Sequence, residues 1–155
     1  MENLVIKEGF NDEEANLIYN LEKELTEEES FANEAEGKKF LEETYSLEKI
    51  RNWRSDFVFT FWDNEDFLGF GRAKKDGWIT HISIDKKHQG KGFGGRMLSI
   101  LEEKLKVQGF KEIYLNSRPE VLKFYTKYGW VAKEDKPINY HGILLIPMKK
   151  EIYSI

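Results

Sequence analysis

The residues with the clearest chemical potential form a glycine-rich stretch, Gly90 to Gly95, with four glycines in six residues. Glycine permits positive φ angles and lets a ligand approach the backbone closely. The apolar spacing of residues 97–105 is typical of an amphipathic helix, and the first N–H groups of a helix have no partner within it. The stretch therefore predicts a phosphate or pyrophosphate site at the start of a helix.

Two known phosphate-binding motifs, the dinucleotide fingerprint and the Walker A loop, do not fully match this stretch. The glycine spacing matches the dinucleotide fingerprint G-x-G-x-x-G, but five polar residues separate the first glycine from the preceding predicted strand. The next predicted strand, residues 113–115, leads into Asn116 where that fingerprint expects an acidic residue. A Walker A loop requires Ser or Thr after Lys91, where the chain has Gly92. Nicotinamide binding stays as an alternative interpretation.

Composition and charge limit the classes of function. The 155 residues are 40% hydrophobic and 14% aromatic, which suits one folded domain and excludes a disordered chain. A net charge of −4 argues against nucleic-acid binding as the main role. No apolar run approaches about 18 residues, so we expect no membrane span. The absence of cysteine excludes disulfides, and the N-terminus is unlike an export signal, so we expect a cytoplasmic protein.

Hydrophobic periodicity predicts a single α/β domain over residues 1–155. The predicted strands, rich in aromatic and β-branched residues, are residues 4–6, 57–62, 67–73, 78–84, 113–115 and 143–146. The predicted helices follow Asn11 or Asp12, surround residues 40–47, cover residues 97–105, and begin at Pro119. Residues 57–73 are expected to form a hairpin, and the helix that joins strands 78–84 and 113–115 predicts that these two strands are parallel.

Three landmarks along the chain resemble the GNAT superfamily of N-acetyltransferases. Residues 89–94, QGKGFG, are similar to its acetyl-CoA loop, Gln/Arg-x-x-Gly-x-Gly/Ala. Residues 124–130, FYTKYGW, resemble its Phe/Leu-Tyr-x-Lys-x-Gly-Phe stretch. Residues 147–150, PMKK, resemble its terminal strand, which often ends Met-x-Lys. The resemblance covers residues 57–150 well, and residues 1–56 match only in the order strand, helix, helix.

The resemblance implies a fold and an activity. The fold is the GNAT fold, an α/β (α+β) domain with a central mixed, mostly antiparallel twisted sheet of six to seven strands and about four flanking helices. The activity is an N-acetyltransferase that moves an acetyl group from acetyl-CoA to a primary amine by direct transfer in a ternary complex. The sequence leaves open whether another acyl-CoA is the donor. The alternative is a non-catalytic acyl-CoA-binding module that acts as a sensor or interaction domain.

The same resemblance implies roles for particular residues. Tyr125 is the acid that protonates the leaving thiolate, whereas Tyr114 and Tyr128 are interpreted as structural. The main chain of residues 82–84 pairs with the pantetheine arm and directs an N–H at the thioester oxygen. An Asn that the family often has seven residues before the tyrosine is Arg118 here. The implied donor-binding residues are Ile82, Ser83, Ile84, Gln89, Gly90, Lys91, Gly92, Phe93, Gly94, Gly95, Asn116 and Arg118.

The base that removes the amine proton is left open by the sequence. A free alkyl amine has a pKa of about 10.4, so a proton must leave it at neutral pH. His81 faces away from Thr80 by strand alternation, and we interpret it as a packing or hydrogen-bonding residue. Water on the Thr80 side of the strand and a glutamate of residues 27–43 are the other candidates. No metal site is predicted, because the three histidines lack ligand spacing.

The acceptor is indicated only by an acidic segment. Between Glu22 and Glu48 the chain has ten glutamates and three lysines, a net charge of −7. The simplest interpretation is a solvated helical face, and the functional one is a negative rim that attracts a cationic amine. We therefore expect a small-molecule or peptide amine as partner, and neither nucleic acid nor membrane. A homodimer stays open, because Trp53 and Trp62 fit either an interface or a core.

Overall fold

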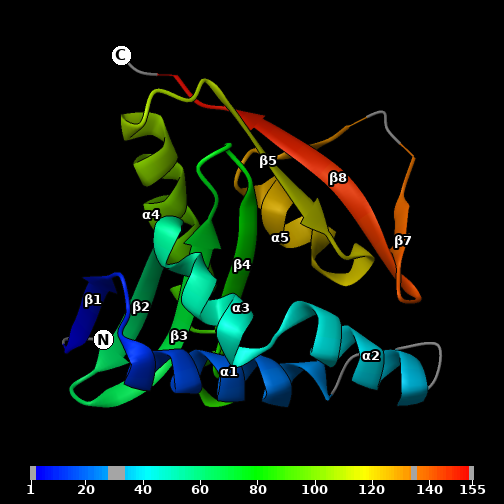
Figure 1. Ribbon diagram of the computed structural model, residues 1–155. Helices are drawn as coiled ribbons and strands as arrows, with labels where there is room; N and C mark the ends of the chain where they lie inside the picture. The colour runs from blue at the N-terminus through cyan, green and yellow to red at the C-terminus, as the bar shows by residue number, and fades with distance from the viewer. Residues whose placement is uncertain (1–2, 28–33, 134–135, 154–155) are drawn as a thin grey trace.

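The chain folds into two β-sheets with helices packed against them, as the computed structural model describes for residues 3–27, 34–133 and 136–153 (Figure 1). The helices are α1 (Asp12–Thr26), α2 (Glu34–Thr44), α3 (Leu47–Asn52), α4 (Phe93–Val107) and α5 (Leu122–Lys127), with 3-10 turns η1 (Trp53–Ser55), η2 (Lys86–His88) and η3 (Pro119–Val121). The strands are β1 (Leu4–Glu8), β2 (Phe57–Asp63), β3 (Asp66–Ala73), β4 (Ile79–Ile84), β5 (Glu112–Ser117), β6 (Val131–Ala132), β7 (Ile138–Tyr140) and β8 (Ile143–Glu151). In the described part of the chain, no helix is both long enough and apolar enough to cross a membrane.

The two sheets are largely antiparallel. The first has the order β1-β2-β3-β4, and the second has the order β5-β8-β6, with β7 paired to the other end of β8. The predicted hairpin of β2 and β3 is confirmed, with Phe57 opposite Ala73 and Asp63 opposite Asp66. The expected α+β fold is therefore present, and its strands divide into two parts over the described residues.

The expected parallel pairing of strands 78–84 and 113–115 is reduced, within the described chain, to a single bridge at the residue just before β4. Trp78 and Tyr114 form that bridge, and the Tyr114 N–H donates to the Gly77 carbonyl at 3.1 Å. Beyond the bridge the two strands diverge (Figure 1). Along Ile79–Ile84, the edge of β4 that faces away from β3 therefore has no neighbouring strand among the described elements.

Two hydrophobic cores lie on opposite faces of the first sheet. α4 buries Met97, Leu98, Leu101 and Leu105 completely in the larger core, which extends to the second sheet. α1 and α3 supply the smaller core, in which Ala15, Ile18, Ile50 and Phe70 are completely buried. The four α4 residues recur at helical spacing, so the predicted amphipathic stripe of this helix is confirmed.

The helix predicted around residues 40–47 is in fact two helices. α2 ends at Thr44, and the Ser46 side chain then caps α3 by accepting a hydrogen bond from the Lys49 N–H at 3.1 Å. Serine at this position offers the backbone an alternative to continued helix, which explains the break. The tryptophans left open between interface and core, Trp53 and Trp62, are only 6% and 7% exposed and belong to the core.

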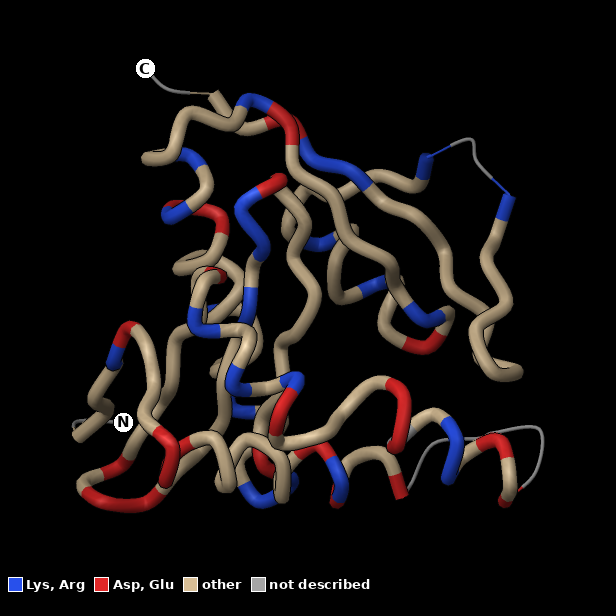
Figure 2. Tube along the Cα trace, viewed as in Figure 1, with Lys and Arg blue, Asp and Glu red and all other residues tan. Residues whose placement is uncertain are grey.

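Charged residues are distributed unevenly over the fold (Figure 2). Asp and Glu are frequent along α1 and α2, whereas Lys and Arg predominate around the second sheet and α5. Part of the acidic charge is used within the fold, since Asp12 pairs with Arg51 at 3.5 Å and with Arg54. The acidic residues of α1 and α2 that the structure describes thus lie mainly on one side of the molecule.

The start of α1 generates the first prediction. Asn11 forms a capping box with Glu14, in which Asn11 Oδ1 accepts from the Glu14 N–H at 2.8 Å and Glu14 Oε1 accepts from the Asn11 N–H at 3.0 Å. Asn11→Ala should lower the free energy of unfolding by about 1 kcal/mol, measured by urea denaturation, because the Glu14 N–H loses its side-chain acceptor. Asn20→Ala, at an exposed position within α1, is the matched control. An equal loss from both substitutions would contradict the assignment of the cap.

Candidate active site

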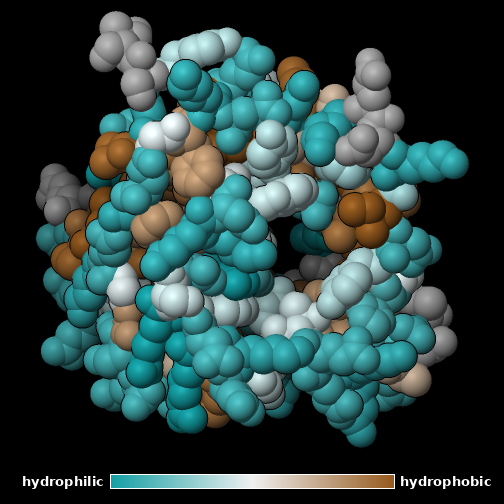
Figure 3. Space-filling model, turned by 45° about the horizontal axis from the view of Figure 1, so that its top comes forward, coloured by the Kyte–Doolittle hydropathy of each residue, from teal (hydrophilic) through white to brown (hydrophobic). Residues whose placement is uncertain are grey.

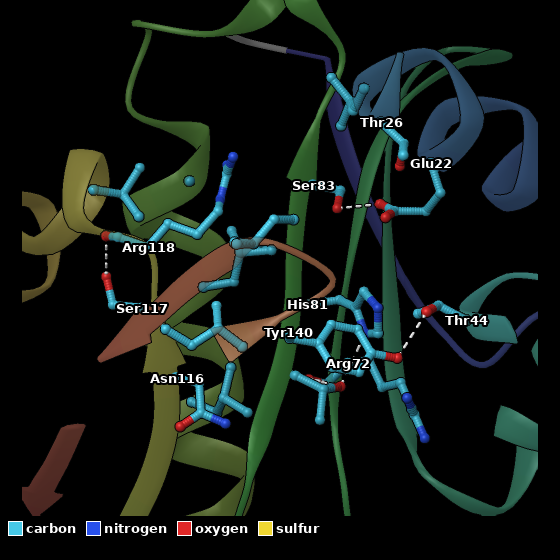
Figure 4. Close-up of a pocket in the computed structure, with 18 of the residues that line it drawn as sticks. Glu22, Thr26, Thr44, Arg72, His81, Ser83, Asn116, Ser117, Arg118 and Tyr140 are labelled. Carbon is cyan, nitrogen blue, oxygen red and sulfur yellow. Dashed lines mark hydrogen bonds between the residues drawn. The ribbon is translucent and has the colours of Figure 1, made fainter. Parts of the chain in front are cut away.

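A cavity of about 940 Å³ opens where β4 and β5 diverge. One wall comes from β3, β4 and the start of α4, and the opposite wall comes from the end of β5, η3 and α5. α1, α2 and the β7–β8 hairpin complete it, as the labelled side chains in Figure 4 illustrate. Figure 3 shows the hollow as an opening with a largely hydrophilic border and hydrophobic residues gathered at one margin. The cavity therefore joins elements from both sheets and from both ends of the chain.

The glycine-rich stretch leads into α4 beside this cavity. Gly90 and Gly92 have φ angles of 77° and 90°, and Gly92 is the N-cap of α4. Residues with a side chain rarely adopt this left-handed backbone conformation, so the turn favours glycine at both positions. Gly94 lines the cavity directly, and an added Cβ there would meet only Phe124, at 3.5 Å. The first turn of α4 thus has no side chain at Gly94 and Gly95, and the Phe93 side chain is buried in the core, which suits an anion site at the helix N-terminus.

The unpaired edge of β4 forms the second backbone feature of the cavity. The Asp85 N–H donates to the Leu68 carbonyl of β3 at 2.8 Å. By antiparallel alternation, the N–H groups of Ile82 and Ile84 then point to the opposite edge, which borders the cavity. Gln89 reaches back to this edge, because its Nε2 donates to the Ile84 carbonyl at 2.9 Å. Gln89 therefore fixes the loop against the end of β4.

Tyr125 projects from α5 into the same cavity. Its ring contacts Phe124 at 5.1 Å and the buried Trp130 at 6.3 Å, measured between centroids. Burial raises the pKa of Tyr125 to about 12, against a smaller opposing effect of the Arg118 guanidinium. The hydroxyl therefore keeps its proton throughout the neutral pH range and can donate it.

The structure brings together most of the residues that the sequence predicts for the site. Tyr125 and seven of the twelve predicted donor-binding residues line the cavity: Ile82, Ser83, Ile84, Gln89, Gly94, Asn116 and Arg118. The other five do not line it: Gly90, Lys91, Gly92, Phe93 and Gly95. Phe93 is a core residue with its ring 6.3 Å from Phe61, and a Cβ on Gly95 would lie 2.1 Å from the Tyr128 hydroxyl. These two positions serve packing of α4, while Gly90 to Gly92 shape the turn that precedes it.

His81 lies among aromatic rings and does not have the properties of a base. Its ring is 4.7 Å from Trp53 and 5.6 Å from Tyr45, and its Nδ1 is 2.9 Å from Thr80 Oγ1. Burial, together with the Arg72 guanidinium, lowers the pKa of His81 to about 3. The imidazole is therefore neutral at physiological pH and holds a proton poorly, in agreement with its interpretation as a packing residue.

A buried carboxylate that sequence reasoning missed lies on the α1 wall. Glu22 is only 5% exposed, lines the cavity, and accepts a hydrogen bond from the Ser83 hydroxyl of β4 (Figure 4). The signal was present, because Glu22 falls seven residues after Ala15 and four after Ile18, on the apolar stripe of α1. The glutamate that the sequence offers as a candidate base lies within residues 27–43 instead. Of these, residues 28–33 lie outside the described chain.

The β7–β8 turn is held against α2 by a histidine between two glutamates. His141 Nδ1 lies 3.1 Å from Glu36 Oε2, and its Nε2 lies 3.1 Å from Glu43 Oε2. The Tyr140 hydroxyl is 3.0 Å from Thr44 Oγ1, and the Phe40 ring packs edge-on against Tyr140. His141 has a φ of 52°, an unusual angle for a residue other than glycine. This Glu36–His141–Glu43 clamp holds the β7–β8 turn against α2, and both elements border the cavity.

Comparisons with known proteins agree on one family. Residues 15–152 match the family described as "Acetyltransferase (GNAT) domain". YjcF of Bacillus subtilis strain 168, described as an uncharacterized N-acetyltransferase, is 30% identical over 93 residues, which cover 58% of this chain and 66% of that protein. The chain therefore matches slightly under two thirds of this relative's length.

Solved structures show the same fold. A GCN5-related N-acetyltransferase from Rhodopseudomonas palustris has a TM-score of 0.83 at 16% identity, over 98% of both chains. The PaiA N-acetyltransferase of Thermoplasma acidophilum, solved in complex with coenzyme A, has a TM-score of 0.79 at 17% identity, over 96% of this chain and 99% of that chain. The predicted architecture is thereby confirmed.

The clamp generates a prediction about local stability. His141→Ala should speed amide hydrogen exchange in residues 138–145 by about tenfold, because the ring that contacts Glu36 and Glu43 is lost. Exchange in β2 should stay unchanged, since β2 lies in the other sheet. His88→Ala is the matched control, because His88 lies in the η2 turn. Unchanged exchange at the hairpin in His141→Ala would show that the clamp does not hold it.

Proposed function

This chain belongs to the GNAT family of acetyltransferases, and we propose that it transfers an acetyl group from acetyl-CoA to a primary amine of a small molecule or peptide. The transfer takes place directly, with both substrates bound in the cavity. One observation carries the proposal: a single cavity is lined by the unpaired edge of β4, by Gly94 in the first turn of α4 and by Tyr125, whose hydroxyl keeps its proton at neutral pH. Acetyl-CoA requires such groups: a strand edge for its pantetheine arm, a helix N-terminus for its pyrophosphate and an acid for its leaving thiolate.

The donor would lie along β4 with its phosphates at α4. The N–H groups of Ile82 and Ile84 can pair with the amides of a pantetheine arm as a neighbouring strand would. The N-terminal end of α4, beyond the turn at Gly92, suits the pyrophosphate. An N–H of the same strand edge can then hold the thioester oxygen as negative charge develops on it. Asn116 and Arg118 face this arm from the opposite wall.

Tyr125 supplies the acid of the reaction. The amine nitrogen attacks the thioester carbonyl carbon, a C–N bond forms and the C–S bond breaks. The sulfur leaves as a thiolate and takes the proton of the Tyr125 hydroxyl. Because burial raises the pKa of Tyr125 to about 12, the hydroxyl holds its proton at neutral pH and can give it to the sulfur as the C–S bond breaks.

The alternative is an acyl-CoA-binding module without turnover. Such a module would need the β4 edge and the α4 start, but it would not need a proton donor. The position of Tyr125 inside the cavity, from an element that contributes nothing to the glycine turn, favours catalysis. Loss of the Tyr125 hydroxyl should lower the rate of an enzyme but should not affect a module that only binds acyl-CoA.

Tyr125→Phe separates them. We expect the rate of thiol release, with a panel of primary amines, to fall by about 10²–10⁴ because the leaving thiolate loses its acid. Acetyl-CoA affinity, measured by calorimetric titration, should stay within a factor of two, because the hydroxyl is not needed to hold the donor. The wild-type rate should show no loss from ionisation of this acid until the pH approaches the pKa of about 12.

The controls are a second tyrosine and a second nucleotide. Tyr114→Phe, on β5 outside the cavity, removes a hydroxyl that donates to Glu112 at 2.7 Å and should leave both measurements unchanged. NADPH should not bind in the calorimeter. An unchanged rate in Tyr125→Phe would refute the assignment of the acid, while binding of NADPH in preference to acetyl-CoA would refute the acetyltransferase proposal.

A further inference from the structure

The walls that α2 and the β7–β8 hairpin contribute to the cavity are largely apolar. Phe40 and Thr44 line the cavity from α2. Tyr140, Ile143 and Leu145 line it from the hairpin. Among the described residues, the Asp, Glu, Lys and Arg side chains of the lining come instead from α1, from around the end of β3 and from the segment around η3. We call Phe40 and the three hairpin residues the apolar wall.

Strand register directs the hairpin residues of the apolar wall toward the cavity. Tyr140 of β7 lies opposite Ile143 of β8, so these two side chains share one face of the hairpin. Leu145 lies on the same face by alternation, whereas Leu144 points the other way and is 45% exposed. The hydrophobic margin of the hollow in Figure 3 lies on the side of this hairpin. Apolar surface that is kept at a cavity and not in a core is typical of a ligand site.

The aromatic rings of the apolar wall are held in place by one another. The Phe40 ring lies 5.5 Å from the Tyr140 ring at 74° and 5.6 Å from the Tyr45 ring at 68°, measured between centroids and ring planes. The Tyr140 hydroxyl is 3.0 Å from Thr44 Oγ1 (Figure 4). These edge-to-face contacts fix the rings without a ligand, and one further ring in the cavity can pack against them in the same way.

The charged residues of α2 and the β7–β8 turn are directed away from the apolar wall. Glu36, Glu43 and His141 contact each other in the clamp, and none of the three lines the cavity. His81, which does line the cavity, is neutral at physiological pH, because burial and the Arg72 guanidinium lower its pKa to about 3. An apolar ligand group can therefore contact the apolar wall without removing water from an ion of that wall.

From the apolar wall we infer that the acceptor is a primary amine that carries an aromatic ring, and that Phe40 and Tyr140 select this ring. The inference rests on the proposed acetyl transfer and names the acceptor class for it. The wall and the β4 edge belong to one cavity, so the amine would lie toward β4 while its ring lies against α2 and the hairpin. The reaction is unchanged: the nitrogen of the neutral amine loses one proton, the sulfur gains one, and no further reactant is needed.

The first test compares three amines as acceptors for wild type. They are 2-phenylethylamine, 2-cyclohexylethylamine, which has the same carbon skeleton without an aromatic ring, and butylamine, which lacks the six-membered ring. Thiol release gives kcat/KM for each at one pH. We expect 2-phenylethylamine to exceed butylamine by about tenfold or more, because the apolar wall contacts the added group. It should exceed 2-cyclohexylethylamine by about threefold or more, because only an aromatic ring gains the edge-to-face contacts.

The second test changes the aromatic part of the wall. Phe40→Leu keeps an apolar side chain and removes the ring, so the ratio of kcat/KM between 2-phenylethylamine and 2-cyclohexylethylamine should fall by about threefold. A general loss of stability lowers both rates alike and leaves this ratio unaltered. Phe10→Leu makes the same change at a partly buried position outside the cavity and is the matched control. Acetyl-CoA affinity should stay within about a factor of two in both variants.

The third test uses the alternation of β8. Leu145→Ala shortens a residue of the apolar wall, and Leu144→Ala makes the same change at the next position, which faces away from the cavity. The ratio of kcat/KM between 2-phenylethylamine and butylamine should fall by about fivefold in Leu145→Ala, because apolar contact is lost. It should stay at the wild-type value in Leu144→Ala.

The aromatic amine has two sources that share this chemistry, a small molecule and the N-terminus of a peptide that begins with an aromatic residue. The dipeptide phenylalanylalanine, assayed beside 2-phenylethylamine, distinguishes them by the larger kcat/KM. Either preference supports the inference, provided that the preferred acceptor loses the advantage of its ring in Phe40→Leu.

The remaining outcomes separate the inference from the proposed function. Equal kcat/KM for the three amines, or an unchanged phenyl-to-cyclohexyl ratio in Phe40→Leu, would overturn the acceptor class and leave acetyl transfer standing. Acetyl-CoA binding without thiol release from any of these amines would also overturn the acceptor class. Failure to bind acetyl-CoA would overturn the proposed function itself.

Discussion

The arrangement of the candidate site depends on the separation of β4 from β5. The two strands meet at the Trp78–Tyr114 bridge and then part, which leaves a strand edge beside a cavity instead of a continuous sheet. An open strand edge is usually a liability, because it invites pairing with another chain. Here the edge borders the cavity, where the proposed donor would pair with it. The candidate site is thus a consequence of sheet topology more than of any one side chain.

Packing of α4 maintains that separation. The helix fills the angle between the sheets with fully buried Met97, Leu98, Leu101 and Leu105. Close approach is possible because Gly71 of β3 faces the helix and Gly95 of the helix faces Tyr128. A Cβ on Gly71 would lie 2.5 Å from Met97 Cγ, and a Cβ on Gly95 would lie 2.1 Å from the Tyr128 hydroxyl. Interiors tolerate such overlap poorly, so these contacts set the position of the helix start relative to β4. On the opposite face, α1 packs through Ala15 and Ile18, and this places Glu22 against Ser83.

Local patterns predicted the elements well, because strands and helices follow from hydrophobic period and from glycine turns. The sequence could also place Tyr125 and the Gly92–Gly94 segment, since both lie within contiguous motifs. It could not give the division into two sheets, because the parting of β4 and β5 depends on how α4 fills the space between them. It missed Glu22 as a site residue for a related reason. A glutamate on an apolar stripe is visible in the sequence, but Ser83 lies 61 residues away and only the fold brings the two together.

The account depends most directly on the claim that the donor pairs with the open edge of β4. Amide hydrogen exchange of Ile82 and Ile84, measured with and without saturating acetyl-CoA, tests that claim at the atoms concerned. The account predicts that both amides become about tenfold or more protected in the complex, while amides of β2 such as that of Val58 do not change. Tight binding of acetyl-CoA that leaves the exchange of Ile82 and Ile84 unaltered would contradict it, because the donor would then lie elsewhere.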